Sequence, residues 1–128
     1  MPARTINQLL ASARRGMQRL EPPDAARAMA GGALLIDTRC AEALGRDGSI
    51  PGATHVPLSV LYWRLDPTSP HRDPVLATPG RQVILLCADG FSSSLAAATL
   101  RQLGFSAATD VVGGFSGWRS AGLPVETA

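Results

Sequence analysis

One stretch, residues 83–103, constrains the fold more than any other part of this 128-residue chain. It opens with four consecutive apolar residues, Val-Ile-Leu-Leu, without the polar alternation of a half-exposed strand. Such a run predicts a strand buried on both faces, as in a parallel sheet covered by helices. An alanine-rich segment with apolar residues at helical spacing follows, and Gly104 is a typical residue to end it. The stretch therefore predicts a strand, a short loop and a helix.

Cys87 occupies the junction between this strand and this helix. The serines at 92, 93 and 94 offer side chains that can cap the helix N-terminus. At such a position the unpaired amides and the positive end of the helix dipole favour an anion, and a thiolate is an anion. The pattern predicts a reactive cysteine. The alternative is a structural cysteine, because free cysteines often pack in protein cores.

Helical and strand-like segments alternate along the rest of the chain. The expected helices cover 5–20, 21–30, 58–65 and 92–103, and the expected strands cover 33–36, 54–56, 83–86 and 107–112. A glycine-rich turn at 113–118 leads into a last helical segment, and the proline-rich residues 66–80 form a long loop. The end of the first segment, residues 17–20, could instead form an edge strand. This order predicts an α/β domain with right-handed crossovers and a parallel sheet.

Composition argues against several classes of partner. The twelve basic residues, all arginines, are dispersed and give a net charge of only +2, so a nucleic-acid interface is not expected. No apolar run approaches the ~20 residues of a membrane span. Arg14, Arg15 and Arg19 follow a short apolar patch, which is the reverse of the order in a secretory signal. We therefore expect a cytoplasmic protein without nucleic-acid or membrane partners.

The spacing of the cysteines limits which cofactors the chain could bind. Cys40 and Cys87 are too far apart in sequence for the C-x-x-C pair of a zinc site or a thioredoxin motif. No metal and no other cofactor is expected. A disulfide between the two is not expected in a reducing compartment.

Charged residues follow a second buried strand. Asp37 and Arg39 lie just after the apolar residues 33–36, at the edge where open α/β sheets keep their binding sites. A fold-stabilising ion pair is the alternative role for both. His55, on a short strand, could be a base, although a lone histidine there is more often a hydrogen-bonded structural residue.

Four motifs, taken together, resemble those of the rhodanese-like domain family. They are Leu35-Ile36-Asp37-Thr38-Arg39, Gly48-Ser49-Ile50-Pro51-Gly52-Ala53, the C-x-x-G loop of Cys87, and Gly113-Gly114-Phe115-Ser116-Gly117-Trp118 with the later Ala121-Gly122-Leu123-Pro124-Val125. They occur in the family's order. The resemblance implies a rhodanese-like domain over residues 18–128, preceded by an N-terminal helical extension over residues 1–17.

The resemblance implies both a fold and an activity. The fold would be α/β, a five-stranded parallel sheet flanked by helices on both faces. The activity would be that of a sulfurtransferase, in which Cys87 takes sulfane sulfur as a persulfide and passes it to cyanide, a thiol or a protein. Successive loop amides can surround a persulfide anion; the residues concerned are Ala88, Asp89, Gly90, Phe91, Ser92 and Ser93. Asp37 and Arg39 would support the site, with Arg39 pairing with Glu42.

The loop departs from the family pattern in its charge. The family commonly has C-x-x-G-x-R-S, whereas Ser92 stands in place of the arginine and Asp89 adds a negative charge. An acidic neighbour raises the pKa of a thiol and repels a dianionic donor. Thiosulfate is therefore expected to be a poor donor unless Arg64 or the helix amides compensate. Asp89 could instead point into solvent and merely shape the turn, and Ser49 replaces a histidine usual in the second motif.

Two other functions use the same scaffold. A phosphatase or arsenate reductase has a loop one residue longer that an arginine closes, but the sixth residue after Cys87 is Ser93. Phosphate would then lack its bidentate partner. A non-enzymatic binding module would dock a partner and would not need Cys87, and an apolar residue such as Phe91 at the loop tip suits that role. A persulfide on Cys87 would distinguish the enzyme from the binding module.

Overall fold

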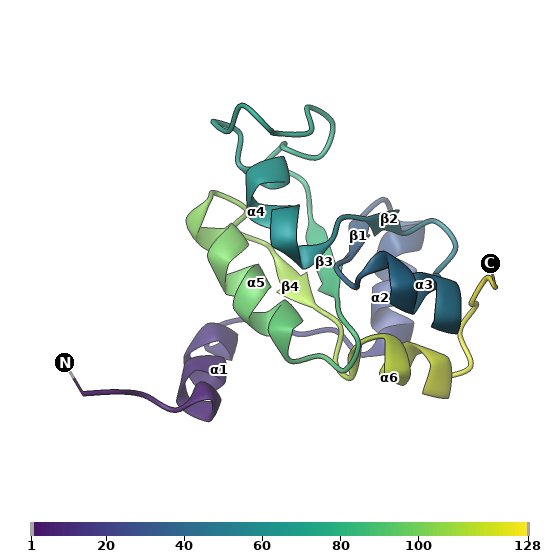
Figure 1. The fold of residues 1–128 in the computed structure, drawn as a ribbon. Coiled ribbons are helices and arrows are strands. Elements are labelled where there is room, and N and C mark those ends of the chain that lie inside the picture. Colours follow the sequence, from purple (N-terminus) through teal and green to yellow (C-terminus); the bar gives the residue numbers. More distant parts are fainter. Residues whose placement is uncertain (1, 128) are drawn as a thin grey trace.

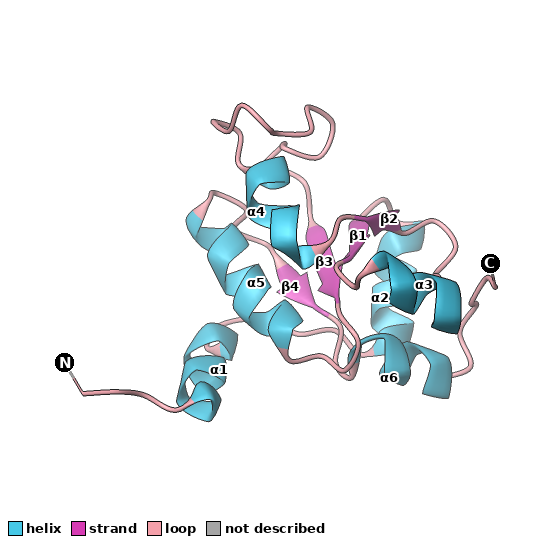
Figure 2. Cartoon of the chain, in the orientation of Figure 1, coloured by secondary structure: helices cyan, strands magenta, loops and turns pink. Residues whose placement is uncertain are grey.

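The computed structural model describes residues 2–127, which form helices around one sheet (Figures 1 and 2). The helices are α1 (Ile6–Arg14), α2 (Pro22–Ala30), α3 (Ala41–Asp47), α4 (Leu58–Leu65), α5 (Ser92–Gln102) and α6 (Gly114–Ser120). The strands are β1 (Leu34–Asp37), β2 (Thr54–His55), β3 (Val83–Leu86) and β4 (Thr109–Asp110). Among the described residues no helix is both long and apolar enough to cross a membrane.

The sheet is parallel, with the strand order β2-β1-β3-β4. This confirms the α/β class and the parallel sheet, but residues 2–127 contain four strands rather than the expected five. A single parallel bridge between Leu20 and Val111 stands at the β4 edge where a fifth strand would lie. The bridge does not continue beyond Leu20 because α2 begins two residues later at Pro22, which has no amide hydrogen to donate.

Helices cover both faces of the sheet, as Figure 1 shows for α4 and α5 on one side and α2 and α6 on the other. Every residue of β1 and β3 is buried, so the unalternated apolar runs are explained by two cores. One core joins Ile36 and Leu85 to α4, α5 and Phe105. The other joins Leu35, Ile84 and Leu86 to α2, Phe115 and Trp118 of α6, and neighbouring loops.

Three helices differ from the sequence expectation, and one of them is α6, which begins at Gly114 inside the expected turn over residues 113–118. The first ends at Arg14 rather than at residue 20, because Gly16 takes a φ of +72° that a continuing helix does not allow. Residues 17–20 then run in extended form to the β4 edge, where Leu20 makes its bridge. Helix α3 was not expected, since its seven residues carry no side-chain N-cap and little apolar periodicity.

Helix α1 lies beside α5 (Figure 1), with Leu10 buried in the contact. Its N-terminus is a capping box, in which Thr5 accepts from the Gln8 amide and the Gln8 side chain accepts from the Thr5 amide. Arg14 lies in the last turn of α1, and its side chain reaches the N-terminal end of α5 at Ser94.

Candidate active site

Cys87 lies at the carboxyl end of β3 and is 6% exposed. The loop that follows it passes to α5 at the lower end of the sheet in Figure 1, next to the start of α6. The Cys87 carbonyl accepts a hydrogen bond from the Phe115 amide at 2.8 Å, and the Ala88 carbonyl accepts one from the Ser116 amide at 3.0 Å. The backbone of α6 thus fixes the start of the loop.

The loop turns at Gly90, which has a φ of +87°. A Cβ at this position would lie 2.8 Å from the Gly113 nitrogen, so only glycine lets the two backbones approach so closely. The turn of the Cys87 loop and the glycine turn before α6 therefore meet in one close backbone contact.

Hydrogen bonds converge on the sulfur. The Gly90 amide donates to Cys87 Sγ at 3.1 Å, and Sγ lies 3.2 Å from Ser93 Oγ. Burial of the thiol acts to raise its pKa. The hydrogen bonds from the Ser93 and Ser92 hydroxyls and from the Ser93 and Gly90 amides outweigh it, so that the pKa of Cys87 lies below its ordinary value. The site therefore favours the thiolate.

Ser93 has a single hydroxyl proton and two neighbours that can accept it. In the thiol form Sγ donates to Ser93, and Ser93 donates to the fully buried Asp110 carboxylate at 2.7 Å. A thiolate has no proton to give, so Ser93 must then turn its hydroxyl to Sγ. Asp110 keeps its other donors in that state, Ser94 at 2.7 Å and the Arg19 guanidinium at 2.8 Å. Ionisation of Cys87 thus leaves no carboxylate unpartnered.

This geometry predicts the pH dependence of alkylation by iodoacetamide. In a Cys40→Ala background, the rate should rise with pH through a midpoint below the ordinary cysteine pKa of about 8.5. Ser93→Ala removes a donor to the thiolate and should raise the midpoint by about one unit. A midpoint that does not move in Ser93→Ala would contradict the role given to this hydroxyl.

Three residues of the site were not expected from the sequence: Asp110, Arg14 and Arg19. Asp110 is 0% exposed and forms a salt bridge with Arg19, whose side chain is 18% exposed. Arg14 Nε donates to Ser94 Oγ at 3.0 Å. An aspartate inside the expected strand over residues 107–112 was the available signal, since a buried carboxylate needs partners.

The serines do not cap α5. Phe91 occupies the N-cap position and makes no side-chain capping bond, so that expectation is wrong. Ser93 and Ser94 are fully buried and turn their hydroxyls to Asp110, which accepts both more favourably than an exposed helix end would. Gly104, with a φ of +106°, follows the end of α5 as expected.

Asp37 and Arg39 form a buried ion pair at 2.7 Å. The expected pairing of Arg39 with Glu42 is wrong, because Arg39 also donates to the Gly48 carbonyl and lies 3.8 Å over the Phe115 ring, which draws it inward. The pair thus contacts the ring of Phe115, whose amide donates to the Cys87 carbonyl, and a supporting role for Asp37 and Arg39 stays a prediction.

Three of the remaining loop residues face outward. Ala88, Asp89 and Phe91 are exposed, the last by 60%. The Asp89 carboxylate accepts a hydrogen bond from Ser116 Oγ at 2.9 Å, so it ties the loop to α6 while it stays in contact with solvent. Ser92 is half-buried at the start of α5.

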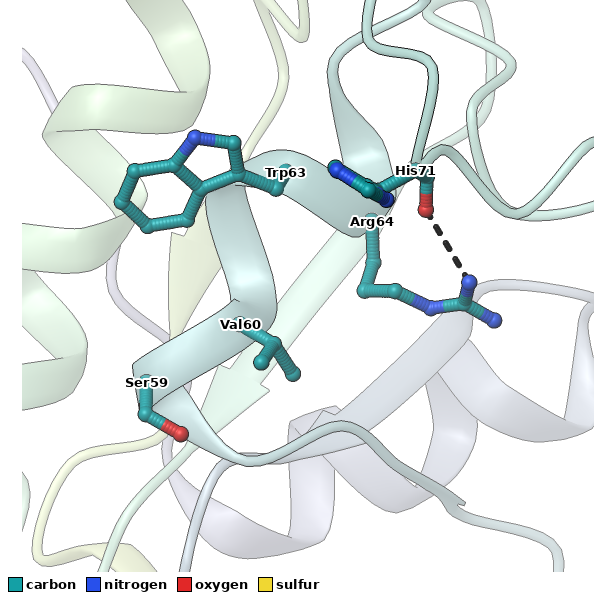
Figure 3. A pocket seen from close by; sticks show the side chains of 5 residues that line it. All are labelled: Ser59, Val60, Trp63, Arg64 and His71. Carbon is teal, nitrogen blue, oxygen red and sulfur yellow. Dashed lines mark hydrogen bonds between the residues drawn. The ribbon is translucent and has the colours of Figure 1, made fainter.

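Arg64 lies apart from this loop. It lines a hollow of about 470 Å³ together with Ser59, Val60, Trp63 and His71. Figure 3 shows how these five side chains lie. Arg64 donates to the His71 carbonyl at 3.0 Å and pairs with Asp73 at 3.4 Å. The end of α4 lies at the top of Figure 1, whereas the connection from β3 to α5 passes at the bottom. A substrate-binding role for Arg64 stays a prediction.

The two other candidate site residues are His55 and Cys40. His55 Nε2 lies 2.6 Å from the Arg39 carbonyl, in keeping with a hydrogen-bonded structural residue. Cys40 is an exposed residue at the start of α3. Within residues 2–127 no group of three or more histidine, cysteine, aspartate or glutamate side chains is arranged to hold a metal ion.

Parts of this chain are similar in sequence to known proteins. The family profile described as Rhodanese-like domain matches residues 21–121. The thiosulfate sulfurtransferase GlpE of Actinobacillus succinogenes is 50% identical over 46 residues, which cover 36% of this chain and 41% of that relative. The chain thus spans less than half the length of the curated relatives it matches.

Solved structures share the fold. A protein of unknown function from Rhodopseudomonas palustris, described as a possible tyrosine phosphatase, is 32% identical with a TM-score of 0.88, over 98% of this chain and 99% of that one. The polysulfide-sulfur transferase homodimer of Wolinella succinogenes is 26% identical with a TM-score of 0.72, over 93% and 85%. Together with the family match and the Cys87 loop, these likenesses establish that the chain belongs to the rhodanese-like domain family.

Proposed function

We propose that this protein is a sulfurtransferase that carries sulfane sulfur as a persulfide on Cys87. The observation that carries the proposal is the convergence of donors on Cys87 Sγ, with the Gly90 amide at 3.1 Å and Ser93 Oγ at 3.2 Å. The substrates would be a small sulfur donor and an acceptor that is cyanide, a thiol or a protein. Relatives described as a thiosulfate sulfurtransferase and a polysulfide-sulfur transferase support this class.

The transfer has two steps that balance without a cofactor. The Cys87 thiolate attacks the outer sulfur of thiosulfate; a sulfur–sulfur bond forms to Cys87, the bond to the sulfonate group breaks, and sulfite leaves with that electron pair. Cyanide then attacks the outer sulfur of the persulfide, and thiocyanate leaves while the Cys87 thiolate returns. The loop amides and the Ser93 hydroxyl would stabilise the negative sulfur in both steps.

Intact mass measurement tests the persulfide directly. Incubation with a sulfane donor should add about 32 Da, one sulfur atom, to the Cys40→Ala protein, and cyanide should remove it with release of thiocyanate. The Cys87→Ala protein should gain nothing. An unmodified Cys40→Ala protein after treatment with thiosulfate and with polysulfide would overturn the proposal.

The mass measurement also separates the sulfurtransferase from a binding module, and a phosphatase assay tests the third function. A binding module would leave Cys87 unmodified and would bind its partner equally well as Cys87→Ala; the 60% exposed Phe91 at the loop tip favours this second candidate. A phosphatase would hydrolyse p-nitrophenyl phosphate. We expect no such hydrolysis, because Arg14 and Arg19 direct their guanidinium groups to the Gly90 carbonyl and not to an oxyanion.

Thiosulfate should be a poor donor, because residues 88–93 include Asp89 and no basic residue. Ser92→Arg adds a cation beside Cys87 and should lower the KM for thiosulfate about three- to tenfold, an effect of roughly 1 kcal/mol. Ser92→Gln is the uncharged control. Steady-state kinetics at low ionic strength measures both, and an unchanged KM in Ser92→Arg would mean that another residue already supplies the charge.

We further propose that residues 18–128 form the catalytic domain, that residues 1–17 extend it, and that the protein acts in the cytoplasm. The family match over residues 21–121 supports the first part. The dispersed arginines support substrates that are small molecules or proteins rather than nucleic acid or membrane.

A further inference from the structure

Two arginines from the N-terminal segment converge on one oxygen atom of the Cys87 loop. Arg14 Nη2 donates to the Gly90 carbonyl at 2.9 Å, and Arg19 Nη2 donates to the same carbonyl at 3.0 Å. A carbonyl oxygen has two lone pairs, so these two charge-assisted hydrogen bonds satisfy it fully. Neither arginine belongs to the loop or to the helix that follows it.

The Gly90 carbonyl sets the direction of the next amide. In a planar trans peptide the C=O and the N–H point to opposite sides, so fixing the Gly90 oxygen toward the arginines turns the Phe91 N–H away from them. The preceding amide, that of Gly90, already donates to Cys87 Sγ at 3.1 Å. A glycine with positive φ has little local restraint on this peptide. Outside contacts must therefore hold its orientation.

The fold brings both arginines to this place by a turn. Arg14 lies in the last turn of the capped helix α1, and Gly16, with a φ of +72°, reverses the chain so that Arg19 returns to the same oxygen. Arg14 also donates to Ser94 Oγ at 3.0 Å, which joins α1 to the first turn of α5. Its guanidinium group thus bridges the loop and the helix at their junction.

We propose that Arg14 is a positioning residue, which acts from α1 by holding the Gly90 carbonyl and so keeps the loop in the path in which the Gly90 amide donates to the sulfur of Cys87. The inference rests on the proposed function for its meaning, since the amide so placed would hold a thiolate or persulfide anion. Arg14 would also compensate for the arginine that the loop lacks. Its positive charge lies at the Gly90 carbonyl, while the loop amides present the positive ends of their dipoles to the anion.

Arg15 provides a matched control. It follows Arg14 directly, carries the same charge and is exposed, so Arg14→Gln and Arg15→Gln remove equal charge from adjacent positions. In a Cys40→Ala background, Arg14→Gln should raise the pH midpoint of Cys87 alkylation by about one unit and slow alkylation near neutral pH about tenfold. Arg15→Gln should change the rate less than twofold. Arg14→Lys keeps the charge and should recover part of the loss.

Equal effects of Arg14→Gln and Arg15→Gln, or an unmoved midpoint in Arg14→Gln, would overturn the proposal. If circular dichroism shows that Arg14→Gln does not fold, Arg14→Lys provides the test, because one ammonium group cannot replace a guanidinium bridge between Gly90 and Ser94. A raised pH midpoint of Cys87 alkylation in Arg14→Lys supports the proposal, and an unchanged midpoint overturns it. Alkylation does not require sulfur transfer. A wild-type protein that transfers no sulfur, yet shows the Arg14 effect, would disprove only the proposed function.

Discussion

Cys87→Ala is expected to reduce cyanide-dependent sulfur transfer by about 10³-fold or more, to the level of the uncatalysed reaction. The substitution removes the atom on which the proposed persulfide would form. No neighbouring side chain can replace it, since hydroxyls such as that of Ser93 are far weaker nucleophiles toward sulfur at neutral pH. Thiocyanate formation with a sulfane donor measures the effect. The overall fold should persist, because alanine fills most of the space of a small buried side chain.

Cys40→Ala is the matched control for this result. Cys40 is exposed and precedes α3, away from the converging donors of the loop, so its removal should leave most of the activity. Loss of transfer in Cys40→Ala with activity retained in Cys87→Ala would reverse the assignment of the nucleophile.

Arg19→Leu is expected to lower the free energy of unfolding by about 3 kcal/mol, because it leaves the buried Asp110 without its cationic partner. For a domain of this size, that loss corresponds to a fall in Tm of roughly 10 °C. Ser93 and Ser94 still donate to Asp110, but two hydroxyls do not neutralise a carboxylate that is 0% exposed. Thermal and urea unfolding followed by circular dichroism measure the change.

Arg27→Leu serves as the comparison. It breaks an ion pair with Asp24 whose side chains are 72% and 49% exposed, and such surface pairs contribute about 0.5 kcal/mol or less. Adding Asp110→Asn to Arg19→Leu removes the uncompensated charge and should recover part of the stability. Similar losses in Arg19→Leu and Arg27→Leu would show that Asp110 does not depend on its salt bridge.

Local signals in the sequence were sufficient for the two central strands, β1 and β3, and for the place of Cys87 at the end of β3. The apolar runs at β1 and β3 are buried on both faces, and helix α4 has the bounds that its pattern predicted. Pro22 and Gly104 mark helix ends where residues of those types usually do. These features depend on periodicity and on backbone restriction, which a short window of sequence contains.

The surroundings of Cys87 depend on contacts between distant segments. Ser93 is six residues from Cys87, but Asp110 lies seventeen residues beyond Ser93, and Arg19 lies 91 residues before Asp110. No local sequence pattern predicts that a serine hydroxyl will donate to a buried carboxylate instead of capping a helix. The loop lacks the arginine common in the family, and Arg64 was the expected substitute, whereas in the folded chain Arg14 and Arg19 reach the loop from the N-terminal segment.

The anchoring of the loop by main-chain groups has a consequence for sequence change. The carbonyls of Cys87 and Ala88 are held by amides of α6, and the carbonyl of Gly90 is held by arginines, so the path of the loop does not depend on the outward-facing side chains of Ala88 and Phe91. Those two positions are therefore free to vary without loss of the scaffold. Under the proposed function, natural drift or deliberate randomisation there would change the choice of sulfur donor and acceptor and leave the contacts of the Cys87 sulfur intact.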